Sequence, residues 1–172
     1  MAGHSDNVAD LPTFEKAPRI AIVIAHYYKA IGDQQLASAV SVIERAGGTH
    51  EVINVPGSLE IGPAIAFAHR QGEFDGYVAL GCVIRGRTSH YDVVVNESAR
   101  AITMLGLAGA CIGNSIITVE NREQAEERAD ASRLDTAGGA AQAALHLIAL
   151  QRSLGPKEKG VGFKLATGGT TV

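Results

Sequence analysis

Four runs rich in apolar residues recur along the chain, and each is followed by polar residues or a turn. The first, at residues 19–26, is continuous. Runs of this length that are rich in β-branched residues are typical of strands covered on both faces of a parallel sheet. We therefore predict four strands, at residues 19–26, 50–57, 77–85 and 110–119, with Pro56 and Gly57 ending the second.

Stretches with helical spacing of apolar residues lie between and after these runs. In the first stretch, Leu36, Val40 and Ile43 share one face, and Asp33 is expected to cap the start of the helix. Pro63 is expected close to the first turn of the second helix, where its missing N–H costs little. The predicted helices cover residues 33–48, 58–72, 90–107, 121–133 and 138–155.

Strands that alternate with helices predict a parallel sheet joined by right-handed crossovers. We expect an α/β three-layer sandwich of the flavodoxin-like type, in which a four-stranded parallel sheet carries helices on both faces. This single domain is expected over residues 18–155, between a flexible N-terminal arm at 1–17 and a flexible C-terminal tail at 156–172. Ligands bind beyond the carboxyl ends of the strands in such sheets, so the loops at that edge are the first place to seek function.

Composition and charge narrow the class of protein. With 172 residues, of which 46% are apolar and 19% charged, the chain is globular and long enough for one good core. The net charge is −3, and no strongly basic patch favours nucleic acid. No apolar run approaches the roughly 18 residues of a membrane span, and the polar N-terminus does not resemble a signal peptide. We expect a cytoplasmic protein that binds neither nucleic acid nor membranes.

Common cofactor and metal signatures are absent from the sequence. There is no G-x-x-x-x-G-K-[ST] loop, and no G-x-G-x-x-G follows the first apolar run. Cys82 and Cys111 lie in apolar runs and are expected to be buried thiols. Because these nucleotide-binding motifs are missing, we expect no cofactor. We also expect no metal, because four of the histidines show no metal-ligand spacing with one another. These are His26, His50, His69 and His146.

The most unusual polar stretch, RGRTSH, begins where the third apolar run ends. Gly86 lets the backbone approach a ligand, Arg87 adds charge, and Thr88 adds a hydroxyl donor. The free N–H groups of the following helix start favour an anion. His90 stands beside this position and could transfer protons near neutral pH. A plain capping loop with a solvated histidine is an equally good interpretation of these residues.

Arg128 is the second candidate for a ligand-binding residue. Its neighbours three and four residues away carry no acid, whereas Arg122 has Glu126 and Arg133 has Asp130 at helical spacing. An arginine without such a partner could bind a phosphate or carboxylate. A freely solvated arginine is the simpler alternative.

Two further positions at the expected carboxyl edge could contact a ligand. Glu60, in the turn formed with Ser58 and Leu59, could accept hydrogen bonds from a polyol or merely favour the helix dipole. Tyr27, after the first strand, could stack on a flat heterocycle or simply pack against its neighbours.

Four collinear segments resemble the 6,7-dimethyl-8-ribityllumazine synthase family. They read VPGSLEIG, DGYVALGCVIRGRTSHYDVV, NESARAI and ITVENREQAEERA, and the resemblance extends from Arg19 to Leu154. It implies a transferase of riboflavin biosynthesis that uses no cofactor. Such an enzyme condenses 5-amino-6-ribitylamino-uracil with 3,4-dihydroxy-2-butanone 4-phosphate and releases phosphate and water.

The resemblance also implies a role for each candidate residue. His90 would be the catalytic, proton-transferring group, Arg128 would bind the phosphate, and Tyr27 would stack on the pyrimidine. The other substrate-binding positions would be Ser58, Leu59 and Glu60 for the ribityl chain, Val83 and Ile84 for the pyrimidine edge, and Gly86, Arg87 and Thr88 for the phosphate.

The resemblance further implies a homo-oligomer, a pentamer whose active sites lie between subunits. Asn114 and Arg128 would then come from the adjacent chain, which would explain why Arg128 lacks a partner within its own helix.

Three departures from the family pattern qualify this interpretation. Arg87 replaces an acid of the phosphate loop, and Asn114 replaces an aromatic residue of the neighbouring subunit. Residues 135–137 align with the family's Asn-Lys-Gly, so its lysine is missing here. Because icosahedral contacts form near that segment, we expect a free pentamer rather than a sixty-subunit shell.

Two other functions are alternatives to this enzyme. One is a catalytically weak paralogue that binds riboflavin or lumazine. A flavodoxin-like signalling domain has little support, because the acidic cluster expected after its first strand is absent here.

Overall fold

The structure, a computed structural model, describes residues 10–155. Residues 1–9 of the predicted arm and the whole predicted tail, 156–172, lie outside this range. The division into an arm, one domain and a tail therefore stays a prediction.

Strands and helices alternate along the described chain, and all four predicted strands and all five predicted helices form. They are β1 (Arg19–Ala25), α1 (Lys29–Arg45), β2 (Thr49–Val55), α2 (Ser58–Gln71), β3 (Gly76–Ile84), α3 (His90–Leu107), β4 (Ile112–Val119), α4 (Arg122–Ala129) and α5 (Thr136–Leu154).

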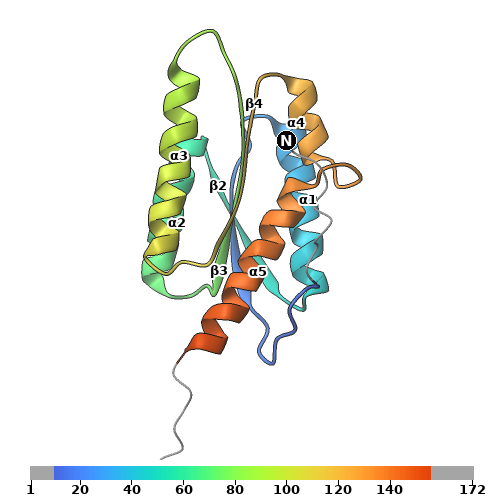
Figure 1. Cartoon of the computed structure of the whole chain (residues 1–172), viewed down its shortest axis with the longest axis vertical. Helices are drawn as coiled ribbons and strands as arrows, with labels where there is room; N and C mark the ends of the chain where they lie inside the picture. The colour runs from blue at the N-terminus through green and yellow to red at the C-terminus, as the bar shows by residue number, and fades with distance from the viewer. Residues whose placement is uncertain (1–9, 156–172) are drawn as a thin grey trace, which may run out of the picture.

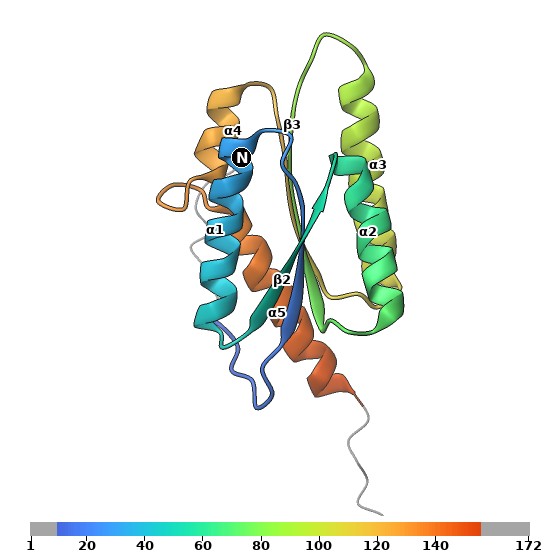
Figure 2. The same ribbon diagram turned by 180° about the vertical axis from the view of Figure 1, so that it is seen from behind.

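The strands form one parallel sheet in the order β2-β1-β3-β4. Figure 1 and, from behind, Figure 2 show α2 and α3 on one face of the sheet and α1, α4 and α5 on the other. The predicted α/β sandwich with a four-stranded parallel sheet and helices on both faces is therefore confirmed. Its topology brings the carboxyl ends of all four strands to the same edge.

Burial on both faces explains why the apolar run of β1 is continuous. In β1, Ile20, Ile22 and Ile24 belong to the core cluster that includes residues of α1 and α5. Ala21 and Val23 point the other way, into the cluster that includes residues of α2 and α3. Full burial of one isoleucine side chain contributes about 1.5–3 kcal/mol, so the two clusters hold the three layers together.

Small residues let the helices lie close to the sheet and to one another. A Cβ atom on Gly113 of β4 would overlap the carbonyl oxygen of Ala140 in α5. A Cβ atom on Gly62 of α2 would lie 2.7 Å from the Cβ of Ala101 in α3. The glycines thus set the spacing between β4 and α5 and between α2 and α3.

The predicted cap of the first helix is wrong. The helix begins at Lys29, four residues earlier than expected, and its N-cap residue, Tyr28, makes no side-chain capping bond. Asp33 lies inside α1, where its carboxylate accepts a hydrogen bond from Lys29 Nζ at 2.6 Å. This pair, one helical turn apart, extends the helix beyond the apolar pattern that predicted it.

The second helix begins at Ser58, as predicted, and Pro63 is its sixth residue, close to the first turn. The helix lacks one main-chain hydrogen bond there, because proline has no N–H. The last helix begins at Thr136, two residues before the predicted start. Asp135 caps it, because the carboxylate accepts a hydrogen bond from the N–H of Gly138 at 3.1 Å.

Gly113→Ala should destabilise the protein, because the added methyl group would overlap a main-chain atom of α5 that cannot move alone. We expect a loss of about 3 kcal/mol, at the upper end of the usual cost of overpacking. Gly139→Ala, one residue from Ala140 on the same helix, is the matched control, since its Cβ would meet nothing within 4 Å. Urea unfolding of both variants measures the difference. Equal stability of the two variants would contradict the close β4–α5 packing.

Candidate active site

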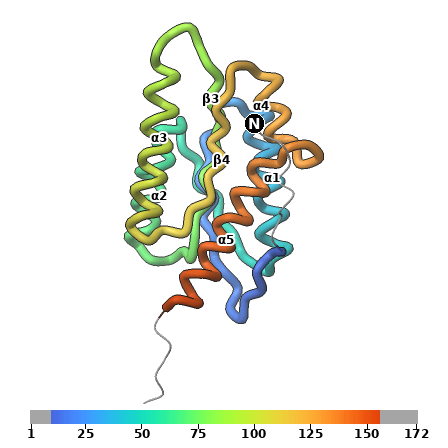
Figure 3. Tube along the Cα trace, viewed as in Figure 1, coloured from blue at the N-terminus to red at the C-terminus, as the bar shows by residue number. Residues whose placement is uncertain are grey.

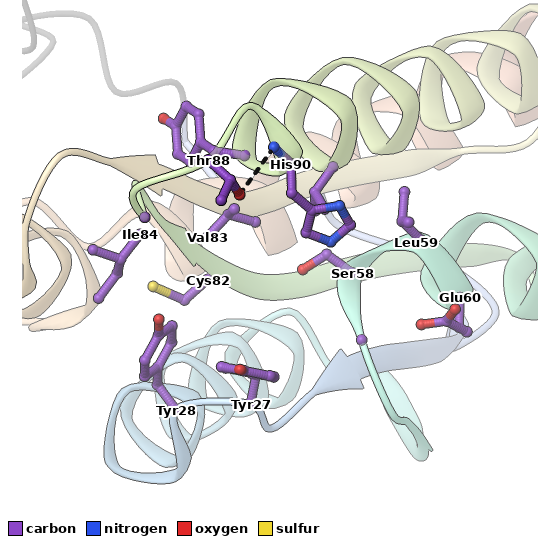
Figure 4. Close-up of a pocket in the computed structure, with 14 residues that line it drawn as sticks. Tyr27, Tyr28, Ser58, Leu59, Glu60, Cys82, Val83, Ile84, Thr88 and His90 are labelled. Carbon is purple, nitrogen blue, oxygen red and sulfur yellow. Dashed lines mark hydrogen bonds between the residues drawn. The ribbon is translucent and has the colours of Figure 1, made fainter.

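A cavity of about 470 Å³ opens at the carboxyl edge of the sheet. This volume lies within the range of roughly 300–1,000 Å³ that is typical of small-molecule sites. Figure 4 shows that its walls come from the β1–α1 turn, the start of α2, the end of β3 and the start of α3. The edge that the parallel topology predicted is therefore the edge where the cavity forms.

Nine of the predicted site residues line this cavity, and three do not. The nine are Tyr27, Ser58, Leu59, Glu60, Val83, Ile84, Gly86, Thr88 and His90. Arg87, Asn114 and Arg128 are not among the lining residues.

Five other residues line the cavity and were not predicted from the sequence: Tyr28, Gly57, Cys82, Tyr91 and Val94. One signal was available for Val94, which stands four residues after His90 and so shares its helix face. Cys82 carried no such signal, because its strand reads as uniformly buried.

The start of α3 is only weakly capped beside His90. Ser89 is the N-cap residue, but it is in the right-handed helical conformation and its side chain makes no capping bond. The side chain of Thr88 accepts a long hydrogen bond, 3.4 Å, from the N–H of His90. N–H groups at the start of a helix attract anions, so this arrangement differs from a loop that caps its own helix.

The start of α2 places a hydroxyl and a carboxylate on another wall. Ser58 is buried at 8% exposure, whereas Glu60 is exposed. Space for the Ser58 hydroxyl exists because Gly81 on β3 has no side chain: a Cβ there would lie 3.0 Å from Ser58 Oγ. In Figure 4 the imidazole of His90 projects into the space that Ser58 borders.

Tyr27 offers an open aromatic face. Its side chain is 74% exposed and meets Tyr28 edge to face, with ring centroids 5.1 Å apart. Burial raises the pKa of Tyr28, and the nearby Cys82 and Tyr27 raise it further. The phenol of Tyr28 is therefore neutral near pH 7. Because the ring of Tyr27 is exposed, it is free to stack on a planar ligand.

Cys82 is an unreactive wall residue. Burial raises the pKa of its thiol to about 11, although the charge of Arg122 acts in the opposite direction. Because the thiolate is the nucleophile, a thiol with this pKa is almost wholly protonated and inert near neutrality.

The environment of Arg128 corrects the helix-spacing argument. Its Nη1 donates to the carbonyl oxygen of Gln124 at 3.0 Å and lies 3.6 Å from the carboxylate of Glu127. The expectation that Arg128 has no acidic partner on its own helix is therefore wrong, because the partner is the adjacent residue. Glu127 also pairs with Arg133 at 3.2 Å, in place of the expected Asp130.

The expected pair between Arg122 and Glu126 is confirmed at 2.7 Å.

A chain of buried and partly buried hydrogen bonds supports the end of the same helix, α4. Gln35 Nε2 donates to the carbonyl oxygen of Ser115 at 2.7 Å, and the hydroxyls of Ser115 and Thr136 share a bond of 2.8 Å. Thr136 then donates to the carbonyl oxygen of Arg128 at 3.1 Å.

The cavity has no cation of its own. Among residues 10–155, no lysine or arginine lines it. Arg87 is exposed on the loop after β3, and Arg128 lies on α4. Asn114 is exposed on the edge strand β4, where its carboxamide oxygen accepts a hydrogen bond from the N–H of Ile116 at 3.0 Å. A phosphate in the cavity of this single chain would meet main-chain donors and a hydroxyl, but no guanidinium.

Two wider features also bear on function. Within the described part of the chain, no group of three or more histidine, cysteine, aspartate or glutamate residues is arranged to hold a metal ion. The helices between residues 10 and 155 include none that is long and apolar enough to cross a membrane.

Comparison with known proteins identifies the family. The profile of the 6,7-dimethyl-8-ribityllumazine synthase family matches residues 17–152. The chain is 66% identical to the 6,7-dimethyl-8-ribityllumazine synthase of Jannaschia sp. (strain CCS1), over 95% of this chain and 92% of that protein. It is 51% identical to the enzyme of the same name from Sphingopyxis alaskensis, over 79% of this chain and 96% of that protein. The chain belongs to the 6,7-dimethyl-8-ribityllumazine synthase family.

Proposed function

We propose that this chain condenses 5-amino-6-ribitylamino-uracil with 3,4-dihydroxy-2-butanone 4-phosphate to form 6,7-dimethyl-8-ribityllumazine. The reaction is a step of riboflavin biosynthesis and releases phosphate and water. The family match over residues 17–152 carries this proposal. The cavity supports it, since an aromatic face, a polar turn, an open helix start and a histidine converge there.

The uracil substrate would occupy the part of the cavity near Tyr27. Its flat ring would stack on the exposed face of Tyr27, with Val83 and Ile84 along the ring edge. The ribityl hydroxyls would bond with Ser58 and Glu60 at the start of α2. A buried hydroxyl beside an exposed carboxylate suits a polyol, which needs both donors and acceptors.

The phosphate of the second substrate would lie at the start of α3. Gly86 and Thr88 line the cavity there, and the first N–H groups of the helix favour an anion. Arg128 would supply the charge that the cavity lacks, reaching the site from a neighbouring subunit. Arg87, on the same loop, would raise the local positive potential.

The chain's own residues would act by positioning the substrates and transferring protons. The uracil's amine attacks the ketone, and loss of water gives an imine. Phosphate is then eliminated, and ring closure with a second loss of water gives the product. Correct orientation of two reactants is worth about 7–11 kcal/mol in favourable cases. His90 would move protons between these intermediates, an effect of roughly 10²–10⁴-fold in rate.

The same proposal includes a pentamer with active sites between its subunits. The support is the incomplete cavity, together with Asn114 and Arg128 lying outside it. Exposed large apolar side chains on α2 and α3 also favour association, because burying them removes apolar surface from water. They are Phe67, Val93, Met104 and Leu107.

The direct test is to mix the purified chain with both substrates and follow lumazine absorbance and released phosphate. We expect both signals to rise together in equal amounts. Binding of riboflavin or lumazine without any turnover would instead support the alternative, a catalytically weak paralogue.

His90→Ala should lower kcat by about 10²–10³-fold, because it removes a proton-transferring group. The KM of each substrate should change little, since the other cavity walls are intact. His50→Ala is the matched control: His50 lies near the start of β2, at the opposite edge of the sheet. Steady-state kinetics of both variants decide the point, and an undiminished kcat for His90→Ala would remove this residue from the mechanism.

Arg128→Ala should raise the KM of the butanone phosphate about 10- to 100-fold, the cost of losing charge-assisted hydrogen bonds to a phosphate. The KM of the uracil should stay within about twofold, because that substrate lies elsewhere in the cavity. Arg133→Ala is the control, since Arg133 shares the carboxylate of Glu127 but has no proposed role. Unchanged phosphate-substrate kinetics in Arg128→Ala would contradict the assignment.

Mixing the two inactive variants tests the shared site. If His90 and Arg128 meet across a subunit boundary, co-refolded His90→Ala and Arg128→Ala chains should regain about one quarter of the wild-type sites, because random mixing restores that fraction of boundaries. No regained activity in a mixed oligomer would place both residues in one chain's site.

A further inference from the structure

We propose that Arg85 is a positioning residue for His90, acting as a clamp across the base of the loop between β3 and α3. The inference rests on the proposed function, because His90 is its target. The loop, residues 85–89, rises above the sheet as an arch, which the tube in Figure 3 shows together with the start of α3.

The arch itself contains little that would hold His90 in place. Gly86 has open space where a side chain would be, and residues 85–90 are all exposed. Ser89 makes no capping bond, and the bond between Thr88 and the His90 N–H is long at 3.4 Å. The position of His90 therefore depends on how the two ends of the arch are fixed.

Arg85 connects those two ends. Its N–H donates to the carbonyl oxygen of Val119 at 2.9 Å, which ties the start of the arch to β4. Its Nε donates to the carboxylate of Glu120 at 2.9 Å, and its Nη1 donates to Asp92 at 3.2 Å. The guanidinium also lies over the ring of Tyr91, 3.9 Å from its centroid.

Two of these partners belong to the same helical turn as His90. Tyr91 and Asp92 are the two residues that follow His90 in the first turn of α3, and Tyr91 itself lines the cavity. The guanidinium of Arg85 lies over the ring of Tyr91 and bonds to the carboxylate of Asp92. Because it is planar and rigid, these two contacts together fix the position and orientation of the first turn of α3. Its hold on Glu120 ties the turn to the neighbouring strand end.

The clamp should govern local order rather than global stability. The side chain of Arg85 is 41% exposed, and its two carboxylate partners are also exposed. Ion pairs between exposed side chains contribute little to the stability of the fold. The rate of catalysis depends more strongly on the position of His90, because a misplacement of a reacting group by about 1 Å can cost roughly 10²-fold in rate. Arg85 is also engaged by two carboxylates, which distinguishes it from a free phosphate-binding cation.

The test compares Arg85→Ala and Arg85→Lys with the wild-type protein. For Arg85→Ala we expect kcat to fall about tenfold, KM of both substrates to stay within about twofold, and amide hydrogen exchange in residues 86–92 to become about tenfold faster. The melting temperature should drop by at most about 4 °C. For Arg85→Lys we expect kcat and the exchange rate to lie between those of the wild-type protein and Arg85→Ala. An ammonium group keeps the charge but cannot donate to two carboxylates in a planar arrangement or lie flat over the ring of Tyr91.

Arg100→Ala is the matched control, since Arg100 is an exposed α3 arginine that pairs only with the local Glu97 among the contacts of the described residues. It should leave kcat and exchange in residues 86–92 unchanged. In the Arg85→Ala background, Glu120→Gln and Asp92→Asn should cost no further activity, as expected for members of one network.

Three results would overturn the proposal. The first is an unchanged kcat in Arg85→Ala, and the second is unchanged hydrogen exchange in residues 86–92. The third is a rise confined to the KM of the butanone phosphate, which would make Arg85 a direct phosphate ligand. If the wild-type protein shows no turnover, the proposed function fails, while the exchange measurement still tests the clamp by itself.

Discussion

The parallel sheet of this protein must be covered by helices on both of its faces. Strands such as β1 contribute side chains to two separate apolar clusters, so helices must cover both sides. Parallel strands on such a sheet need helical crossovers, and these bring the carboxyl ends of the strands and the starts of α1, α2, α3 and α4 to one edge. The cavity lies at this edge, where the turns between strand ends and helix starts form its walls.

Under the proposed function, the electrostatics of this edge would make one chain only part of a site. The start of α3 favours an anion, yet within residues 10–155 no lysine or arginine lines the cavity. Arg85 is held by the carboxylates of Glu120 and Asp92, and Arg128 by that of Glu127. In the proposed pentamer, a dianionic phosphate would compete with Glu127 for the guanidinium of Arg128.

The arginines of this protein differ in their partners, and only some of those partners could be predicted from helical spacing. Helical spacing singled out Arg128 but overlooked Glu127, since adjacent residues on a helix do not normally face each other. The long side chain of Arg128 instead folds back toward Gln124 and comes within 3.6 Å of Glu127. Arg85 carried no signal in the sequence, because its partners at the end of β4 and in α3 become neighbours only after folding.

The alternation of strands and helices, the parallel sheet, the edge that carries the cavity and nine of its lining residues could all be predicted from the amino-acid sequence. Those features follow from apolar periodicity, from turn residues and from the resemblance carried by motifs such as VPGSLEIG, all of which are local along the chain. The folded chain was needed to show which charges are paired, that Gly81 leaves room for the Ser58 hydroxyl, and that Arg128 lies outside the cavity. These depend on distances between segments far apart in sequence, which packing sets and local pattern does not encode.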